Sequence, residues 1–212
     1  MKIIIFGASG KTGIEVVKQA LEQGNDVVAF VRNPKKITIV DNKLTIVKGD
    51  VTDGNAVTES MKEVDSVIVA LGASADMQSD VVLATGTANI IMAMKKYGVK
   101  RIIIQSSYPM SGYEDGIVFL KQIGMGEEQI GMIKPVLDDK RKQIEVVLQS
   151  GLEFVVVKPM MLTDEIKTEK YRVAENLEVK PGDKISRADV ADFMLKALTN
   201  TEFVGKIVTI TS

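Results

Sequence analysis

Short apolar runs alternate along this chain with longer segments in which apolar residues recur at helical spacing. The runs are rich in β-branched residues, which predicts buried strands at 3–6, 27–31, 44–47, 66–71, 101–105 and 154–157. Helical spacing predicts helices at about 14–23, 55–62, 80–97, 136–149 and 187–198. Strands and helices in alternation indicate a parallel sheet with helices on both faces. We therefore expect an α/β protein built on a Rossmann-like, doubly wound parallel sheet.

The C-terminal part departs from this alternation. Residues 207–210 predict an outer strand, and 171–173 predict a further short strand. We expect residues from about 159 to 186 to form a small C-terminal elaboration that contributes to the substrate side. Because no internal boundary is visible, residues 1–212 are expected to form a single domain.

A glycine-rich turn follows the first predicted strand directly, as Gly7-Ala8-Ser9-Gly10-Lys11-Thr12-Gly13. At a strand-to-helix turn, bare backbone N–H groups and the helix dipole can hold an anion. The ending Gly10-Lys11-Thr12 is similar to a P-loop, but that motif needs a glycine where Ile5 stands. The glycine spacing instead predicts a dinucleotide turn, in which the third glycine allows close helix-to-strand packing. An ordinary tight βα turn is the alternative. The candidate cofactor-binding residues here are Gly7, Ser9, Gly10, Lys11, Thr12 and Gly13.

Composition narrows the partners and the chemistry. Lys plus Arg is 27 against Asp plus Glu 28, with no long basic run, which disfavours nucleic acid as a primary partner. No apolar stretch is long enough to span a membrane and the N-terminus lacks signal-peptide order, so we expect a cytoplasmic protein. The chain has no cysteine and no histidine, which excludes thiolate and imidazole chemistry and zinc sites built from them. No acidic cluster suggests a metal ion.

Ligands of open parallel sheets bind at the carboxyl ends of the strands. Arg32 lies 19 residues after Gly13 with no acid beside it, which favours a cofactor with a 2′-phosphate, NADP(H), over NAD(H). A solvated basic loop is the alternative. Asp50 and Val51 follow the third strand and could meet an adenine, although Asp50 is equally explained as a turn or cap residue.

The fourth, fifth and sixth predicted strands are also followed by candidate residues. Small residues after the fourth strand let a ribose or nicotinamide approach the backbone. Serine hydroxyls after the fifth strand stand beside the expected nicotinamide position, unless they only cap the end of that strand. Residues after the sixth strand make an apolar wall. The candidates from these three ends are Leu71, Gly72, Ala73, Ser106, Ser107, Lys158, Pro159 and Met160.

In this order, the motifs resemble the atypical short-chain dehydrogenase/reductases of the NAD(P)H-binding, NmrA-like group, including the biliverdin reductase B (flavin reductase) type. The resemblance rests on the glycine turn, Val31-Arg32-Asn33-Pro34, Gly49-Asp50-Val51, Ser150-Gly151-Leu152 and Ile185-Ser186-Arg187-Ala188-Asp189-Val190-Ala191. It implies one NAD(P)-binding domain that holds NADP(H). The 2′-phosphate would lie near Arg32, the pyrophosphate over the glycine turn, adenine by Asp50 and Val51, and nicotinamide near Gly72, Ser107 and Pro159.

The chain departs from this group in its catalytic residues. Typical short-chain dehydrogenases place a tyrosine four residues before a lysine on the helix preceding the sixth strand, but Val136 stands four residues before Lys140. Lys140 lies on an apolar stripe, so we expect it to point inward near the start of its helix. Met161 replaces a histidine common in the flavin-reductase type, which puts biliverdin-like substrates in doubt.

The resemblance to the flavin-reductase type, whose members also lack the tyrosine, implies direct hydride transfer from NADPH to a flavin, quinone or similar planar acceptor, without a Tyr-Lys relay. Ser107, Lys140 and Tyr108 are the catalytic candidates. The alternative is a non-catalytic, NADP(H)-sensing regulatory protein of the NmrA-like type.

Residues 111–135 are apolar and glycine-rich. A substrate lid, an oligomer contact and a packed helix all fit this composition, which leaves a homodimer open. Tyr108 and Tyr113 at its start could supply a proton or stack on a ligand.

Overall fold

The computed structural model describes residues 1–72, 82–108 and 113–212. Its main sheet runs in the order β3 (Leu44–Lys48), β2 (Asp26–Val31), β1 (Lys2–Phe6), β4 (Ser66–Val69), β5 (Arg101–Gln105), β6 (Glu153–Pro159), β10 (Lys206–Thr211) and β8 (Arg172–Ala174). Each neighbouring pair is parallel except β10 with β8, which is antiparallel. The chain changes direction across the sheet between β1 and β4, where such sheets bind ligands.

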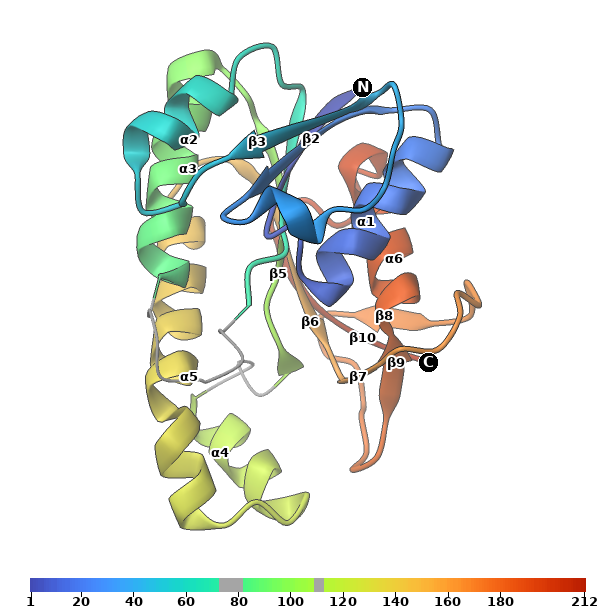
Figure 1. The fold of residues 1–212 in the computed structure, drawn as a ribbon. Helices are drawn as coiled ribbons and strands as arrows, with labels where there is room; N and C mark the ends of the chain where they lie inside the picture. The colour runs from blue at the N-terminus through green and yellow to red at the C-terminus, as the bar shows by residue number, and fades with distance from the viewer. Residues whose placement is uncertain (73–81, 109–112) are drawn as a thin grey trace.

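Helices cover both faces of this sheet (Figure 1). On one face, α1 (Lys11–Glu22) packs against α6 (Arg187–Thr199). On the other, α3 (Leu83–Tyr97) packs between α2 (Gly54–Ser60) and α5 (Glu127–Leu148). The predicted Rossmann-like, doubly wound fold is therefore confirmed.

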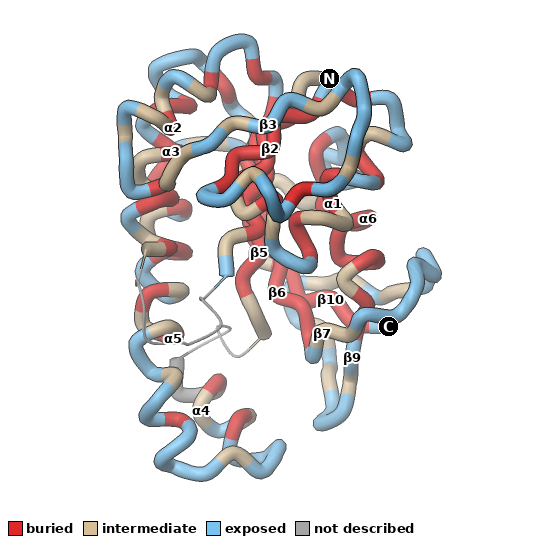
Figure 2. Tube along the Cα trace, in the orientation of Figure 1, coloured by how far each residue is buried: buried red, intermediate tan, exposed pale blue. Residues whose placement is uncertain are grey.

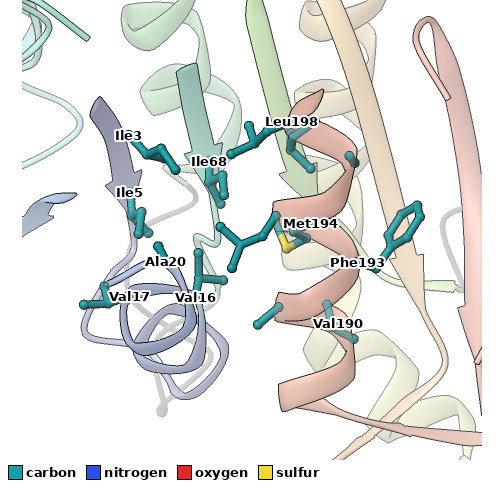
Figure 3. Packing of buried hydrophobic residues seen from close by; sticks show 14 of the residues in the cluster. Ile3, Ile5, Val16, Val17, Ala20, Ile68, Val190, Phe193, Met194 and Leu198 are labelled. Carbon is teal, nitrogen blue, oxygen red and sulfur yellow. The ribbon is translucent and has the colours of Figure 1, made fainter. Parts of the chain in front are cut away.

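The central strands β1, β2, β4 and β5 are continuous apolar runs because both of their faces are buried. Along β1, Ile3 and Ile5 join the core under α1 and α6, whereas Ile4 and Phe6 join the core on the opposite face. Figure 3 shows the first of these cores, with Met194 of α6 directed toward the β1 side chains. Burial is concentrated in the sheet and on the inner helix faces, and the outer faces are exposed (Figure 2). This rigid body fixes the carboxyl ends of the strands, from which the site is built.

The edge of the sheet differs from the prediction. The strand predicted at 207–210 lies inside the sheet, because β8 pairs with it and takes the edge, with Val173 opposite Ile210. The strand predicted at 66–71 ends at Val69, so residues 70–72 form a loop that is free to line a cavity.

The segment 111–135 is mainly helical in the residues described. It contains α4 (Tyr113–Gln122) and the first half of α5, which extend together beyond the sheet (Figure 1). Gly124, with φ +89°, ends α4, and the Met125 N–H donates to the Leu120 carbonyl at 3.0 Å. α5 begins at Glu127 and continues through Pro135, so Lys140 lies in the middle of this helix and not near its start.

The C-terminal elaboration adds a second, two-stranded sheet. β7 (Met161–Thr163) pairs in parallel with β9 (Lys184–Ser186). A short 3₁₀ helix, η1 (Pro34–Lys36), follows β2 on the nucleotide side. Neither β7, β9 nor η1 was expected from the apolar pattern, because each spans only three residues. β7 leads into Asp164 and β9 leads into α6.

Candidate nucleotide-binding site

A cleft of about 540 Å³ opens at the carboxyl ends of β1 to β5. Of the predicted cofactor and catalytic residues, those that line it are Gly7, Ser9, Gly10, Lys11, Thr12, Arg32, Asp50, Val51, Leu71, Gly72, Ser106, Ser107 and Lys140. The cleft therefore joins the loops that follow five consecutive strands of the sequence. The motifs predicted after these strands therefore lie together around one cleft.

The glycine turn has a geometry that excludes side chains. A Cβ on Gly7, whose φ is +79°, would lie 2.5 Å from the Ala70 carbonyl oxygen. A Cβ on Gly13 would lie 2.1 Å from the Gly7 carbonyl oxygen. Gly13 does not line the cleft but lets α1 approach the turn, which is the packing role expected from its spacing. These contacts leave the floor of the cleft formed by bare backbone.

The amino end of α1 faces the same floor. Its N-cap residue is Gly10, which has no side chain to satisfy the first N–H groups of the helix. The first turn contains Lys11 and no acidic residue. Free N–H groups, the helix dipole and a lysine together favour an anion at this position.

Basic and acidic groups meet at the β2 and β3 end. Arg32 is exposed, and Lys36 of η1, which was missed at the sequence level, lines the cleft with it. The Asp50 carboxylate accepts hydrogen bonds from the Thr52 N–H at 2.9 Å and the Thr52 hydroxyl at 2.7 Å. These hydrogen bonds, helped by the charge of Arg32, lower the pKa of the Asp50 carboxyl. Asp50 is thus both a turn residue and a lining residue, so the two predicted roles are compatible.

The β5 end carries a buried hydroxyl. Ser106 is 2% exposed, and its Oγ has no hydrogen-bond partner among the described residues. Its N–H donates to the Val157 carbonyl at 2.7 Å, so the residue still belongs to the sheet edge. A buried polar group without a partner costs about 1–3 kcal/mol, and a bound polar ligand would satisfy it. Capping the strand is therefore not what this hydroxyl does.

Lys140 reaches the cleft from α5 on the opposite face of the sheet from α1 and α6. Burial lowers the pKa of its ammonium from 10.5 to about 8, and the neighbouring Asp139 charge partly opposes this shift. No hydrogen bond or ion pair to its side chain is found within 1–72, 82–108 and 113–212. Lys140 therefore brings an exchangeable proton into the cleft near neutral pH.

Four other predicted residues do not line the cleft. β6 continues through Pro159 beside β10, so Lys158 and Pro159 are strand residues opposite Thr209 and Ile210, and Met160 is buried after them. The Tyr108 ring packs edge-on against Phe119 of α4 at 4.9 Å. Ala73 lies outside the described residues.

A three-member charge cluster beside the glycine turn was also missed. The Asp164 carboxylate pairs with Lys11 at 2.7 Å and with Arg187, and these two cations lower its pKa. Lys11 and Arg187 both line the cleft, as does Leu162 of β7. Arg187 is the first residue of α6 and lies within the motif 185–191. This motif was the sequence feature from which Arg187 could have been recognised as a site residue.

The rest of that motif holds the C-terminal loop in place. The Ser186 hydroxyl accepts from the Asp189 N–H at 2.9 Å and caps α6. The buried Asp189 carboxylate accepts from the Thr168 and Glu169 N–H groups, each at 2.8 Å. These bonds fix the loop that carries Asp164 toward Arg187.

The model of a family described as NAD(P)H-binding matches residues 7–201 of this chain. The chain belongs to the NAD(P)H-binding family. An uncharacterised chloroplast protein of Arabidopsis thaliana is 28% identical over 228 residues, which span 99% of this chain and 76% of that protein. Two further curated relatives match over 50% and 35% of this chain, in each case 33% of their own length.

Solved members of similar fold agree with this assignment. A Rossmann-fold NAD(P)-binding family protein from Shigella flexneri has a TM-score of 0.74 at 27% identity, over 99% of this chain and 92% of that one. The anaerobillin reductase ChuY from Escherichia coli O157:H7 has a TM-score of 0.80 at 21% identity, over 99% and 96%. The NAD(P)H-binding family and the Rossmann-like fold that the resemblance implied are therefore confirmed.

Two features fit the nicotinamide dinucleotide that this family binds. The glycine turn presents bare backbone because a Cβ on Gly7 or Gly13 would collide, and the buried Ser106 hydroxyl has no hydrogen-bond partner among the described residues. No group of three acidic, histidine or cysteine side chains able to hold a metal ion is found in the described part of the chain. None of its described helices is long and apolar enough to cross a bilayer.

Proposed function

We propose that this NAD(P)H-binding protein is an NADPH-dependent reductase of a flavin, quinone or similar planar acceptor. The carrying observation is Lys140, which lines the cleft together with Ser106 and Ser107, while Val136 stands where a catalytic tyrosine would be needed. A lysine without that tyrosine is poorly suited to the usual proton relay to an alcohol. It is well suited to an acceptor that takes a hydride directly.

The polar groups of the cleft support NADP(H) over NAD(H). Arg32 and Lys36 offer two cations for a 2′-phosphate. The glycine turn lines the same cleft and would hold the pyrophosphate, and Val51 lines it and would pack on the adenine ring. The loop at Leu71 and Gly72 borders the nicotinamide end.

The protein residues have separate tasks in the proposed reaction. When bound, the cofactor supplies the hydride. The Ser106 and Ser107 hydroxyls donate or accept hydrogen bonds at the nicotinamide end and orient what is bound there. Lys140 holds a proton at Nζ, which it can give to the reduced acceptor and regain from water. Its positive charge also stabilises negative charge that develops on the acceptor.

The test is NADPH oxidation at 340 nm with FMN, several quinones and biliverdin as acceptors. We expect turnover with at least one planar acceptor, and a lower turnover number in Lys140→Met with little change in NADPH affinity. Silence across the panel, in a preparation that binds NADPH tightly, would overturn the proposal.

The absence of a tyrosine at position 136 also favours a second candidate, an NADP(H)-sensing regulatory protein. Such a sensor must bind NADP⁺ and NADPH with different affinities without turning either over. Equal affinities for the two forms in titration calorimetry would argue against it.

A further inference from the structure

Asp139 is a buried carboxylate on α5 with no part in the proposed reaction. It is 2% exposed, and its two oxygens accept hydrogen bonds from the Leu83 N–H at 2.6 Å and the Ala84 N–H at 3.1 Å. These are the first two residues of α3, whose N-cap Val82 has no polar side chain. The first N–H groups of a helix lack partners within the helix, and a negative charge there is favoured by the dipole. α3 is thus capped by a side chain from α5.

A second polar contact joins the same two helices one turn further on. Gln143 donates from Nε2 to the Thr87 hydroxyl at 2.9 Å, and both residues are fully buried. Asp139 and Gln143 are four residues apart and share one face of α5. The Asp139 contacts fix the rotation of α5 next to Lys140, and the Gln143 contact ties α5 to α3 one turn away from Lys140.

The rotation of α5 decides where Lys140 points. Successive residues of an α-helix are about 100° apart around the axis, so directing Asp139 at α3 sets the direction of the next side chain. That direction leads into the cleft, which Lys140 lines together with Val82. The Asp139 carboxylate therefore links α5, which carries Lys140, to the start of α3, and both lie at the border of the cleft.

We propose that Asp139 is a positioning residue, which holds the Lys140 ammonium in the cleft by capping α3 from α5. The proposal rests on the proposed function only for the use made of Lys140, because the contact between Asp139 and α3 involves protein atoms alone. Loss of the cap should let α5 turn and Lys140 reach solvent. Burial is the main cause of its lowered pKa, so the Lys140 pKa should then rise toward 10.5.

The direction in which the Lys140 pKa changes distinguishes a positioning role of Asp139 from a purely electrostatic one. If Asp139 were only a nearby charge, its removal would leave Lys140 buried with one attraction fewer, and the Lys140 pKa would fall further. Asp139→Ala leaves the other charged groups near Lys140 unchanged. They are Asp138 and Arg141 on α5, and Lys11, Arg32, Lys36, Asp50 and Arg187 around the cleft.

The experiment is a pH titration of the full-length protein with ¹³C-methylated lysines, followed by NMR, in which Lys140→Arg identifies the Lys140 signal. In Asp139→Ala, we expect the Lys140 midpoint to rise by about one pH unit or more above the wild-type value. A fall or no change would overturn the proposal. Asp138→Asn is the matched charge control and should leave the midpoint in place.

A third variant separates positioning from general destabilisation. Thr87→Val removes the other α3–α5 hydrogen bond and should lower the melting temperature while leaving the Lys140 midpoint unchanged. If Asp139→Ala does not fold, Ala84→Pro removes one of the two capped N–H groups and keeps the Asp139 charge, at a helix position where proline is tolerated. A rise supports positioning, and an unchanged or lower midpoint refutes it. Because the readout needs no substrate, it stands even if no acceptor is reduced.

Discussion

Replacing Lys140 by methionine should stabilise the protein at neutral pH and remove a pH dependence that the wild type carries. The folded protein binds a proton at Lys140 with a pKa of about 8, whereas the unfolded chain binds it with the ordinary value of 10.5. Between these values the unfolded chain holds more protons than the folded one, so wild-type stability must rise with pH there. The cost of charging Lys140 is fully present below about pH 8 and is gone by about pH 10.5.

The size of this cost follows from the two pKa values. The difference between 10.5 and about 8 corresponds to about 3 kcal/mol, at about 1.4 kcal/mol for each tenfold change in proton affinity. This is an upper limit, because Lys140 is only partly buried and meets water through the open cleft. Methionine keeps most of the length of the side chain and fills irregular space well. Lys140→Met should thus be more stable than the wild type by up to about 3 kcal/mol at pH 7.

Urea denaturation followed by far-UV circular dichroism at pH 7, 8, 9 and 10 would measure this difference. We expect the advantage of Lys140→Met to shrink steadily above pH 8. Lys158, whose pKa burial also lowers, contributes equally to both proteins and cancels in the difference. Lys142→Met, at an exposed position of the same helix, should change stability by less than about 0.5 kcal/mol at every pH. A stability difference that stays constant from pH 7 to 10 would show that the reasoning about Lys140 is wrong.

Three further predictions concern cofactor binding. Arg32→Ala should weaken NADPH binding by about 1.5 to 3 kcal/mol, the scale of a hydrogen bond to a charged group, and spare NADH; equal losses in calorimetry would refute a 2′-phosphate contact. Gly13→Ala places a Cβ 2.1 Å from a backbone oxygen of the turn, so we expect a lower melting temperature and loss of NADPH binding, whereas Gly131→Ala, which meets no atom within 4 Å, should do neither. Asp164→Asn frees its two cationic partners and should tighten NADPH binding at low salt with a steeper salt dependence. Glu165→Gln is its control, and identical behaviour of the two variants would exclude those cations from phosphate binding.

The sheet and its order of elements could be predicted because they depend on local patterns. Buried parallel strands need continuous apolar runs, and each such run was visible in the sequence. The glycine turn could be predicted because its spacing is itself a local pattern, and the collision at Gly13 involves residues within the turn. Local pattern failed at Pro135, where proline predicts a helix boundary but α5 continues. It also failed at Pro159, because pairing with β10 extends β6 beyond the apolar run.

The remaining parts of the site depend on contacts between residues far apart in sequence. Asp164 meets Lys11 only because the Asp189 hydrogen bonds hold its loop, and nothing near position 164 signals that partner. The apolar stripe of α5 correctly indicated that Lys140 points inward, but not which cavity it enters. Asp138 and Asp139 are indistinguishable in sequence, yet only Asp139 caps a helix that starts 56 residues earlier. The proposed reduction without a Tyr-Lys relay depends on such placement, because Lys140 must face the acceptor. The chemistry proposed for this protein therefore rests as much on the α3–α5 contact as on the glycine turn.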